Sequence, residues 1–135
     1  MRTIKLWLAT IAMLLCSIMA NAEDFAVDGI YYNITSETDK TVAVTYQGNS
    51  YFENIDEYSG SVTIPESVTY NGNTYSVITI GTRAFMGCSN MMSVTIPNSV
   101  TTLGEYAFSN CRSLTEILIP NSVTTFEFGV FQFCI

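Results

Sequence analysis

A stretch of seven residues that occurs twice, 23 positions apart, constrains the fold of this chain more than any other feature. IPNSVTT at 96–102 recurs letter for letter at 119–125, and nine of 23 positions are identical between 89–111 and 112–134. Self-similarity at a fixed period of about 20 to 50 residues is typical of repeat architectures. Each copy is too small to bury its own apolar side, so successive copies stack on one another.

Flanking positions follow the same period. Phenylalanine recurs at Phe85, Phe108 and Phe131, and cysteine at Cys88, Cys111 and Cys134. We expect the phenylalanine row to lie in the core, because one apolar residue per copy at a fixed position is what a stacked core requires.

An earlier copy carries an insertion. SVTIPESVT at 61–69 matches 93–101 at every position but one, but the offset is 32, so nine extra residues follow Thr69. They surround Asn71-Gly72, and Asn-Gly between β-forming residues is a strong hairpin signal. The sequence therefore predicts a hairpin insertion over 70–78.

The local pattern of one copy predicts a strand and a turn. In 93–96 the apolar Val94 and Ile96 alternate with Ser93 and Thr95, and period-two alternation of β-branched residues indicates a short strand. The proline that follows lacks an N–H group, so strand pairing stops there. The side chains expected to point back into the core are those of Val100, Leu103, Val123 and Phe126. The small and aromatic pair in Ala-Phe-x-x-Cys at 107–111 suits a helical or 3₁₀ turn.

These motifs resemble a known repeat family. The pattern Leu114-x-x-Ile117-x-Ile119-Pro120, followed by Asn-Ser-Val-Thr-x-Leu-Gly-x-x-Ala-Phe-x-x-Cys as in 98–111, resembles the BspA-like leucine-rich repeat of secreted and cell-surface bacterial proteins. Residues 25–34 and 41–46 resemble the β-hairpin cap that often precedes these repeats. The last copy has Glu127 in place of Gly104 and lacks a polar capping repeat after it, so we expect an N-terminal fragment of the array.

The resemblance implies a β-dominated α/β fold. We expect a right-handed leucine-rich-repeat solenoid of 23-residue coils, each with one short parallel strand plus helical or 3₁₀ turns, after an antiparallel β-hairpin cap. The expected division is a signal peptide at 1–22, the cap at 23–58 and repeats at 59–135, with copies at 59–88, 89–111 and 112–134.

The N-terminus indicates export. Arg2 and Lys5 precede an apolar run at 6–19, and Ala20-Asn21-Ala22 supplies the small-x-small pattern that signal peptidase requires. The run is shorter than the ~20 residues of a membrane-spanning helix, and a bulky Leu15 before Cys16 disfavours lipidation. We expect an exported protein without membrane insertion after cleavage, extracellular or at the cell surface, with the periplasmic side as an alternative.

Charge and composition exclude several functions. After residue 22 the chain has three bases and all twelve acids, which leaves a net charge of −9. Such a surface repels nucleic acids and anionic membranes. The sequence has no histidine, which removes Ser-His and Cys-His nucleophile pairs and imidazole metal sites. No Gly-rich loop or other catalytic constellation is present, so we expect no enzyme and no cofactor.

The three repeated cysteines have two interpretations. Stacked copies would place Cys88, Cys111 and Cys134 within reach of disulfide geometry in an oxidising compartment. The favoured interpretation is three small buried hydrophobes, because an odd number leaves one unpaired. A metal site would need a fourth ligand, and the sequence offers none at suitable spacing.

The acidic residues Glu53, Asp56 and Glu57 form a second candidate. Clustered carboxylates can bind calcium or serve acid–base chemistry. No EF-hand pattern surrounds them, so we expect a solvated loop, with calcium binding as the alternative.

The outward positions of the stacked strands form the candidate protein-binding face. They are Ser61, Thr63, Ser93, Thr95, Glu116 and Leu118. Repeat arrays bind partners with such continuous surfaces, although a merely solvated face is the simpler alternative. A second possible contact set is the cap tyrosines, expected to be exposed: Tyr31, Tyr46, Tyr51 and Tyr70.

Together these features favour a secreted or surface-displayed binding module. The resemblance implies protein–protein recognition, namely adhesion to host or bacterial surface proteins, including extracellular-matrix components. The alternative is a structural spacer or a truncated fragment of a larger surface protein.

Overall fold

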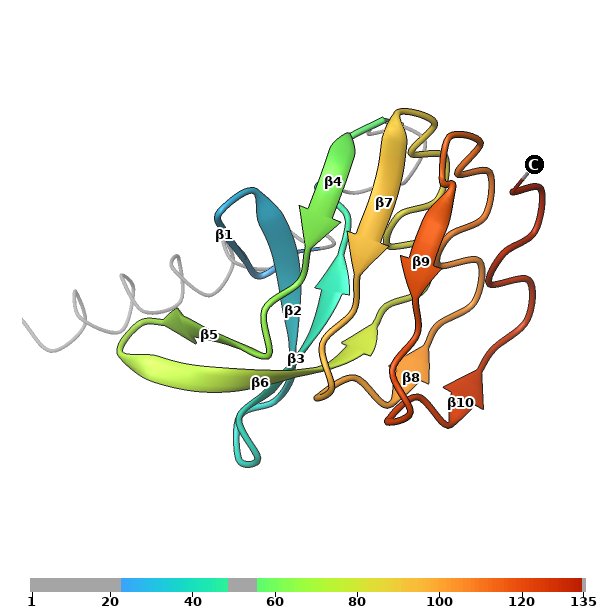
Figure 1. Cartoon of the computed structure of the whole chain (residues 1–135). Helices are drawn as coiled ribbons and strands as arrows, with labels where there is room; N and C mark the ends of the chain where they lie inside the picture. Colours follow the sequence, from blue (N-terminus) through green and yellow to red (C-terminus); the bar gives the residue numbers. More distant parts are fainter. Residues whose placement is uncertain (1–22, 49–55, 135) are drawn as a thin grey trace, which may run out of the picture.

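This computed structural model describes residues 23–48 and 56–134. The strands of these residues form two β-sheets (Figure 1). The expected signal peptide at 1–22 lies outside the described residues. The first sheet begins with two N-terminal antiparallel connections and continues into the repeats, in the strand order β1-β2-β3-β6-β8-β10, with β5 paired to β6. Its strands are β1 (Phe25–Val27), β2 (Ile30–Ser36), β3 (Thr41–Thr45), β5 (Ser67–Tyr70), β6 (Asn73–Ile80), β8 (Thr102–Leu103) and β10 (Thr125–Phe126).

The second sheet contains the strands that the repeat pattern predicts. It has the order β4-β7-β9 and is parallel throughout. Its strands are β4 (Gly60–Thr63), β7 (Met91–Thr95) and β9 (Glu116–Leu118). Val62 pairs with Val94, and Val94 pairs with Ile117, so equivalent positions of the three copies lie side by side.

Two tight turns shape the antiparallel part of the first sheet. Asp28-Gly29 joins β1 to β2, and Asn71-Gly72 joins β5 to β6. All four residues have positive φ, between 47° and 79°. Positive φ at both central positions defines the type I′ hairpin turn, which Asp-Gly and Asn-Gly favour because they tolerate the left-handed region. The second strand of the later hairpin, β6, continues into the repeat array, where Thr79 and Ile80 pair with Thr102 and Leu103.

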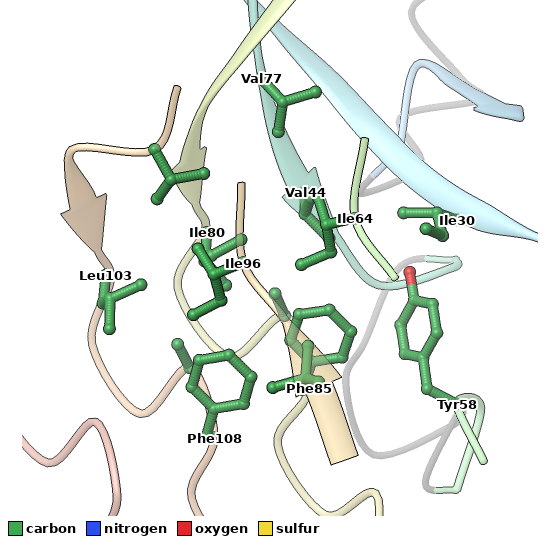
Figure 2. Close-up of a cluster of buried hydrophobic side chains, with 14 of the residues drawn as sticks. Ile30, Val44, Tyr58, Ile64, Val77, Ile80, Phe85, Ile96, Leu103 and Phe108 are labelled. Carbon is green, nitrogen blue, oxygen red and sulfur yellow. The ribbon is translucent and has the colours of Figure 1, made fainter. Parts of the chain in front are cut away.

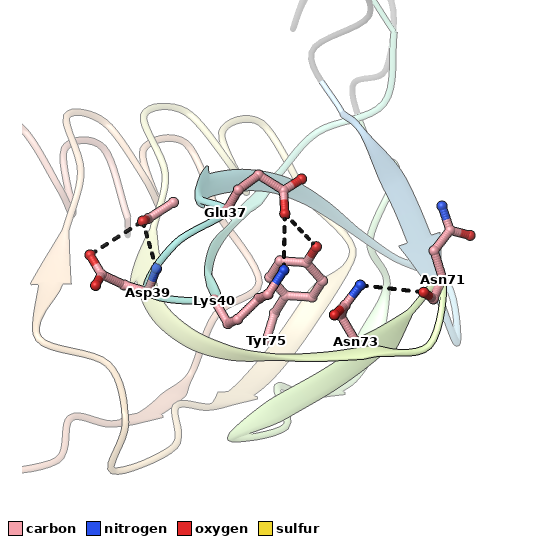
Figure 3. A network of polar contacts seen from close by, with 7 residues as sticks. Glu37, Asp39, Lys40, Asn71, Asn73 and Tyr75 are labelled. Carbon is pink, nitrogen blue, oxygen red and sulfur yellow. Dashed lines mark hydrogen bonds and ion pairs between the residues drawn. The ribbon is translucent and has the colours of Figure 1, made fainter.

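A polar network holds the β2–β3 turn against this hairpin (Figure 3). The carboxylate of Glu37 accepts hydrogen bonds from Lys40 Nζ at 3.3 Å and from the Tyr75 hydroxyl at 2.9 Å. These two donors lower the pKa of Glu37, the Tyr75 hydroxyl being the larger cause. Glu37 and Lys40 both lie in the β2–β3 turn, whereas Tyr75 lies on β6, so the Glu37–Tyr75 hydrogen bond connects the cap to the hairpin.

Each of the last two copies contributes two strands, so the expectation of one strand per coil is wrong. After β7 the chain turns at Pro97 and forms β8, and after β9 it turns at Pro120 and forms β10. β8 pairs with β6 and β10 pairs with β8, all in parallel. A two-residue strand is defined only by its pairing with the neighbouring copy, so its own residues carry no recognisable pattern.

The described residues contain no helix, so the expected helical or 3₁₀ turns are also wrong. Runs of hydrogen-bonded turns take their place at 82–87, 105–110 and 128–133. Left-handed residues recur within them, at Arg83, Tyr106 and Gly129 and again at Gly87, Asn110 and Phe133. A residue in the left-handed region of φ interrupts an α-helix. Along the first two runs the N–H groups donate alternately to a carbonyl of the same copy and to a carbonyl of the next copy.

The alternation explains how the turn runs stack. Met86 N donates to Arg83 O within its own run, at 3.1 Å. Phe85 N donates instead to Ala107 O in the next copy, at 2.8 Å, and Phe108 N donates to Val130 O at 2.9 Å. The turn runs therefore form a third hydrogen-bonded side of the array, which satisfies backbone groups that would otherwise be buried without partners.

An aromatic row forms the centre of the core (Figure 2). The rings of Phe85 and Phe108 are stacked with centroids 5.1 Å apart, and Phe108 stacks on Phe131 at 5.6 Å. Phe85 and Phe108 are fully buried and Phe131 packs partly buried against them, so the expected core row is confirmed. Tyr58 extends the row toward the cap, with its ring centroid 4.7 Å from that of Phe85.

The positions expected to point inward are buried in all but one case. Val100 and Leu103 are fully buried, and Val123 is 9% exposed. Phe126 is 52% exposed, which contradicts the expectation. It lies on β10, the last strand of the first sheet, where no neighbouring strand of the described chain covers it.

Candidate binding surface

The strand register brings the six expected surface residues together in two parallel rows. Ser61, Ser93 and Glu116 are directly paired across β4, β7 and β9, and so form the first row. The second row, two residues further along each strand, is Thr63, Thr95 and Leu118. Of the residues between the two rows, Val94 is buried, while Val62 and Ile117 are half-buried and pack against the core. We call these six residues the strand face.

The strand face is polar along β4 and β7 and has one apolar side chain, Leu118, on β9. The hydroxyl of Ser93 donates to that of Ser61 at 2.9 Å, which links neighbouring copies on the first row. Five of the six residues are exposed and Ser93 is half-buried. Leu118 is 67% exposed, so it offers an apolar contact next to the carboxylate of Glu116.

Met92 adds a second apolar side chain beside this face, and sequence reasoning did not identify it. The pairing of β4 with β7 shifts register between Gly60 and Ser61, and this leaves Met92 unpaired. Its side chain is 55% exposed. A bulge inserts one extra residue into a strand and so interrupts the alternation of inward and outward side chains. Nothing in the sequence indicates where this bulge occurs.

The cap tyrosines do not form an exposed contact set. Tyr31, Tyr46 and Tyr70 are all half-buried, and Tyr51 lies outside the described residues. The Tyr70 ring stacks on Phe25 with centroids 4.2 Å apart, and the Tyr31 ring meets the edge of Tyr58 at 6.1 Å. The rings of Tyr31 and Tyr70 pack the cap against the core, which explains why these two tyrosines are half-buried.

The acidic stretch holds backbone amides of two different segments. The Asp56 carboxylate accepts from Ser89 N at 2.6 Å, and the Glu57 carboxylate accepts from Gln47 N at 2.9 Å. Burial raises the pKa of Glu57. Asp56 is exposed and Glu57 half-buried, so the expected solvated loop holds only for Asp56. Glu53 lies outside the described residues. Within 23–48 and 56–134, no group of three or more His, Cys, Asp or Glu could hold a metal ion.

The cysteine row is packed in the core as free thiols. Cys88 and Cys111 are buried, which confirms the favoured interpretation for these two, and Cys134 is half-buried. The thiol of Cys111 donates to Phe85 O at 3.0 Å, and that of Cys134 donates to Phe108 O at 2.9 Å. Burial raises the pKa of Cys88 to about 11, so the thiolate form is scarce at neutral pH.

Within residues 23–48 and 56–134, no helix is long and apolar enough to cross a bilayer.

Comparison with known proteins identifies the repeat region. Residues 73–135 match the family model of the BspA type leucine rich repeat region. No curated protein matches the chain. Among solved structures, a leucine-rich repeat protein from Bacteroides ovatus ATCC 8483 is 41% identical, with a TM-score of 0.62. The alignment spans 74% of this chain and 24% of that one.

Two further structures are similar. A leucine rich cell surface protein from Faecalibacterium prausnitzii A2-165 is 29% identical over 82% of this chain and 28% of its own, with a TM-score of 0.64. The leucine-rich repeat protein of T. pallidum is 21% identical over 83% of this chain and 46% of its own, with a TM-score of 0.62, and this likeness shows the fold alone. The chain thus spans about a quarter of the length of the first two structures.

Proposed function

This chain carries a BspA-type leucine-rich-repeat region over residues 73–135, and from that premise we propose that it is an exported module that binds a protein partner through the strand face. The observation that carries the proposal is the register of β4, β7 and β9. It places three copies of one outward position in a row, twice, and repeat arrays use such extended surfaces for recognition.

The composition of the strand face supports a protein partner. Hydroxyl groups and a carboxylate provide directional hydrogen bonds, while Leu118 and Met92 provide exposed apolar area at the same sheet. Protein interfaces combine an apolar centre with a polar rim. The acidic balance of the chain opposes nucleic acids, because they repel a negative surface.

Several finer points belong to the same proposal. The repeats form a right-handed solenoid of 23-residue coils, with the cap at 23–58 and the array at 59–135. The partner is a host or bacterial surface protein, extracellular-matrix components included. Export through the N-terminal leader is supported by the sequence of 1–22. The module has no catalytic role, since leucine-rich-repeat modules generally bind without catalysing.

The experiment uses the protein produced from the whole chain with its leader. It is tested against immobilised fibronectin, collagen and bacterial envelope preparations by surface plasmon resonance. Thr95→Arg and Glu116→Lys change the middle and the edge of the strand face without touching the core. Glu105→Lys is the matched control, because Glu105 is an exposed acid on a turn run.

We expect saturable binding to one of these surfaces, lost with Thr95→Arg and Glu116→Lys and kept with Glu105→Lys. Each hot-spot residue of an interface contributes about 2 kcal/mol or more, so a loss of at least ~30-fold is expected. A folded protein that binds none of them contradicts this proposal and favours the structural spacer.

A further inference from the structure

A cavity of about 270 Å³ lies between the cap and β4. On one side it is lined by the β1–β2 turn at Asp28 and Gly29 together with Ile30, and on the other by residues of 57–63. Ser61 and Thr63 of the strand face belong to this lining, so the cavity adjoins the proposed binding surface at its N-terminal end. Small-molecule sites commonly have volumes of about 300 to 1,000 Å³, so the cavity is better matched to one long side chain.

The edge of β4 that faces away from β7 is unpaired within the described part of the chain. β4 is the end strand of its sheet, with β7 as its one neighbour there. Gly60 N donates to Asn90 O and Ile64 N donates to Thr95 O, so the even-numbered positions direct their backbone groups toward β7. Alternate residues of a strand direct theirs to opposite edges. The N–H and C=O groups of Ser61 and Thr63 therefore point to the free edge.

The charged side chains that line the cavity are both acidic. Asp28 and Glu57 both contribute to its lining. Glu57 uses one carboxylate oxygen for Gln47 N, while its other oxygen, Oε1, is buried without a hydrogen-bond partner. No lysine or arginine lines the cavity. A basic side chain placed beside these two carboxylates would form charge-assisted hydrogen bonds with them.

We propose that the free edge of β4 accepts an extended segment of a protein partner as an added strand, with an arginine or lysine side chain placed in the cavity beside Asp28 and Glu57. The inference rests on the proposed binding function and specifies the chemistry of the partner. Main-chain hydrogen bonds to Ser61 and Thr63 provide affinity, as in other cases of strand addition. The paired charges select the basic side chain.

The test uses two short synthetic peptides that alternate threonine and valine around one central residue. That residue is arginine in one peptide and citrulline, its neutral isostere, in the other. Binding is followed by two-dimensional NMR of the ¹⁵N-labelled protein. We expect the arginine peptide to shift the amide resonances of Ser61 and Thr63 and to bind about tenfold more tightly than the citrulline peptide, which lacks the charge-assisted hydrogen bond.

Two variants separate the contributions of charge and edge. The pair Asp28→Asn and Glu57→Gln removes both charges but keeps an Asn-Gly turn and an acceptor for Gln47 N, and it abolishes the preference for arginine. Ser61→Pro removes one donor at the free edge without touching the ladder to β7, and it weakens both peptides. The charge-matched control, Glu105→Gln with Glu127→Gln, keeps the preference.

Equal affinity for the two peptides, absence of binding, or resonance shifts away from β4 would overturn the inference. These outcomes are separable from a failure of the proposed function. If the strand-face substitutions leave partner binding intact while the arginine peptide still binds at β4, the strand face is wrong and the edge site stands. If partner binding needs the strand face but neither peptide binds, the edge site alone is wrong.

Discussion

The hydroxyl of Tyr58 donates a 2.8 Å hydrogen bond to the carbonyl oxygen of Thr45, at the end of β3. The same hydroxyl accepts a hydrogen bond from Tyr31 N at 3.1 Å. Its ring packs against Phe85 at the start of the aromatic row. One buried side chain thus joins the antiparallel cap to the repeats through both polar and apolar contacts.

We therefore predict that Tyr58→Phe destabilises the protein while it keeps the aromatic packing. The substitution leaves a buried carbonyl and a partly buried amide without their partner, which costs about 1 to 3 kcal/mol. Chemical denaturation monitored by circular dichroism measures the change. Tyr70→Phe is the control, because Tyr70 stacks on Phe25 through its ring, and its loss of a hydroxyl should have little effect. Equal effects of the two substitutions would contradict this role of Tyr58.

The aromatic row makes a second prediction about stability. Phe108 is fully buried between Phe85 and Phe131, so Phe108→Ala should cost about 3 to 5 kcal/mol. Phe133 is 59% exposed, and Phe133→Ala should stay within about 0.5 kcal/mol of wild type. Urea unfolding of both variants decides this, and a mild effect of Phe108→Ala would show that the stacked copies are not one cooperative core.

The pKa of Glu57 predicts a pH dependence. Burial raises it above the ordinary value of 4.5, so the folded state opposes ionisation of this carboxyl. The stability linked to it is present below pH 4.5 and is lost as the pH rises through the folded pKa. Glu57→Gln keeps an acceptor for Gln47 N and removes the charge.

The variant should therefore melt at a higher temperature than wild type at pH 7, with the difference closing toward pH 4. Differential scanning calorimetry across this range tests it. A variant that is less stable than wild type at pH 7 would mean that the charged form of Glu57 is favoured by its surroundings, and would also weaken the argument for the cavity beside β4.

The thiols should react in a fixed order. Burial raises the pKa of Cys88 to about 11 and raises that of Cys111 and Cys134 as well, and thiolate is the reactive form. Cys134 is the most exposed of the three. With iodoacetamide at mildly alkaline pH, mass spectrometry should find alkylation first at Cys134, and at Cys88 and Cys111 only after unfolding. Early labelling of Cys111 would contradict its burial in the row.

The strands of the second sheet and the core row were predictable from the sequence because both follow the period of the repeat. Val62, Val94 and Ile117 occupy equivalent positions in the three copies, and the structure pairs them. Period-two alternation then fixes which side chains face outward. The strand face could be read from those two facts alone.

Other features depend on contacts between copies and leave a weaker trace in the sequence. The turn runs replace the expected helices because Arg83 and Tyr106 adopt positive φ, and neither residue type signals that conformation. The equivalent residue of the third turn run is Gly129, and glycine does indicate a position that can adopt positive φ. Strand β8 exists through its pairing with β6, and the cavity beside β4 joins Asp28 to residues about thirty positions later, which no local pattern could predict.

The central claim is that the face of β4, β7 and β9 contacts a protein partner, and photo-crosslinking tests it most directly. A benzoylphenylalanine residue is placed at Thr95 on the face or, as the control, at Glu105 on a turn run, and each protein is irradiated with the surface that binds it. The account predicts a covalent adduct with a single partner protein from position 95 and none from position 105. Adducts from 105, with none from 95, would place the contact on the turn side of the repeats and contradict the account.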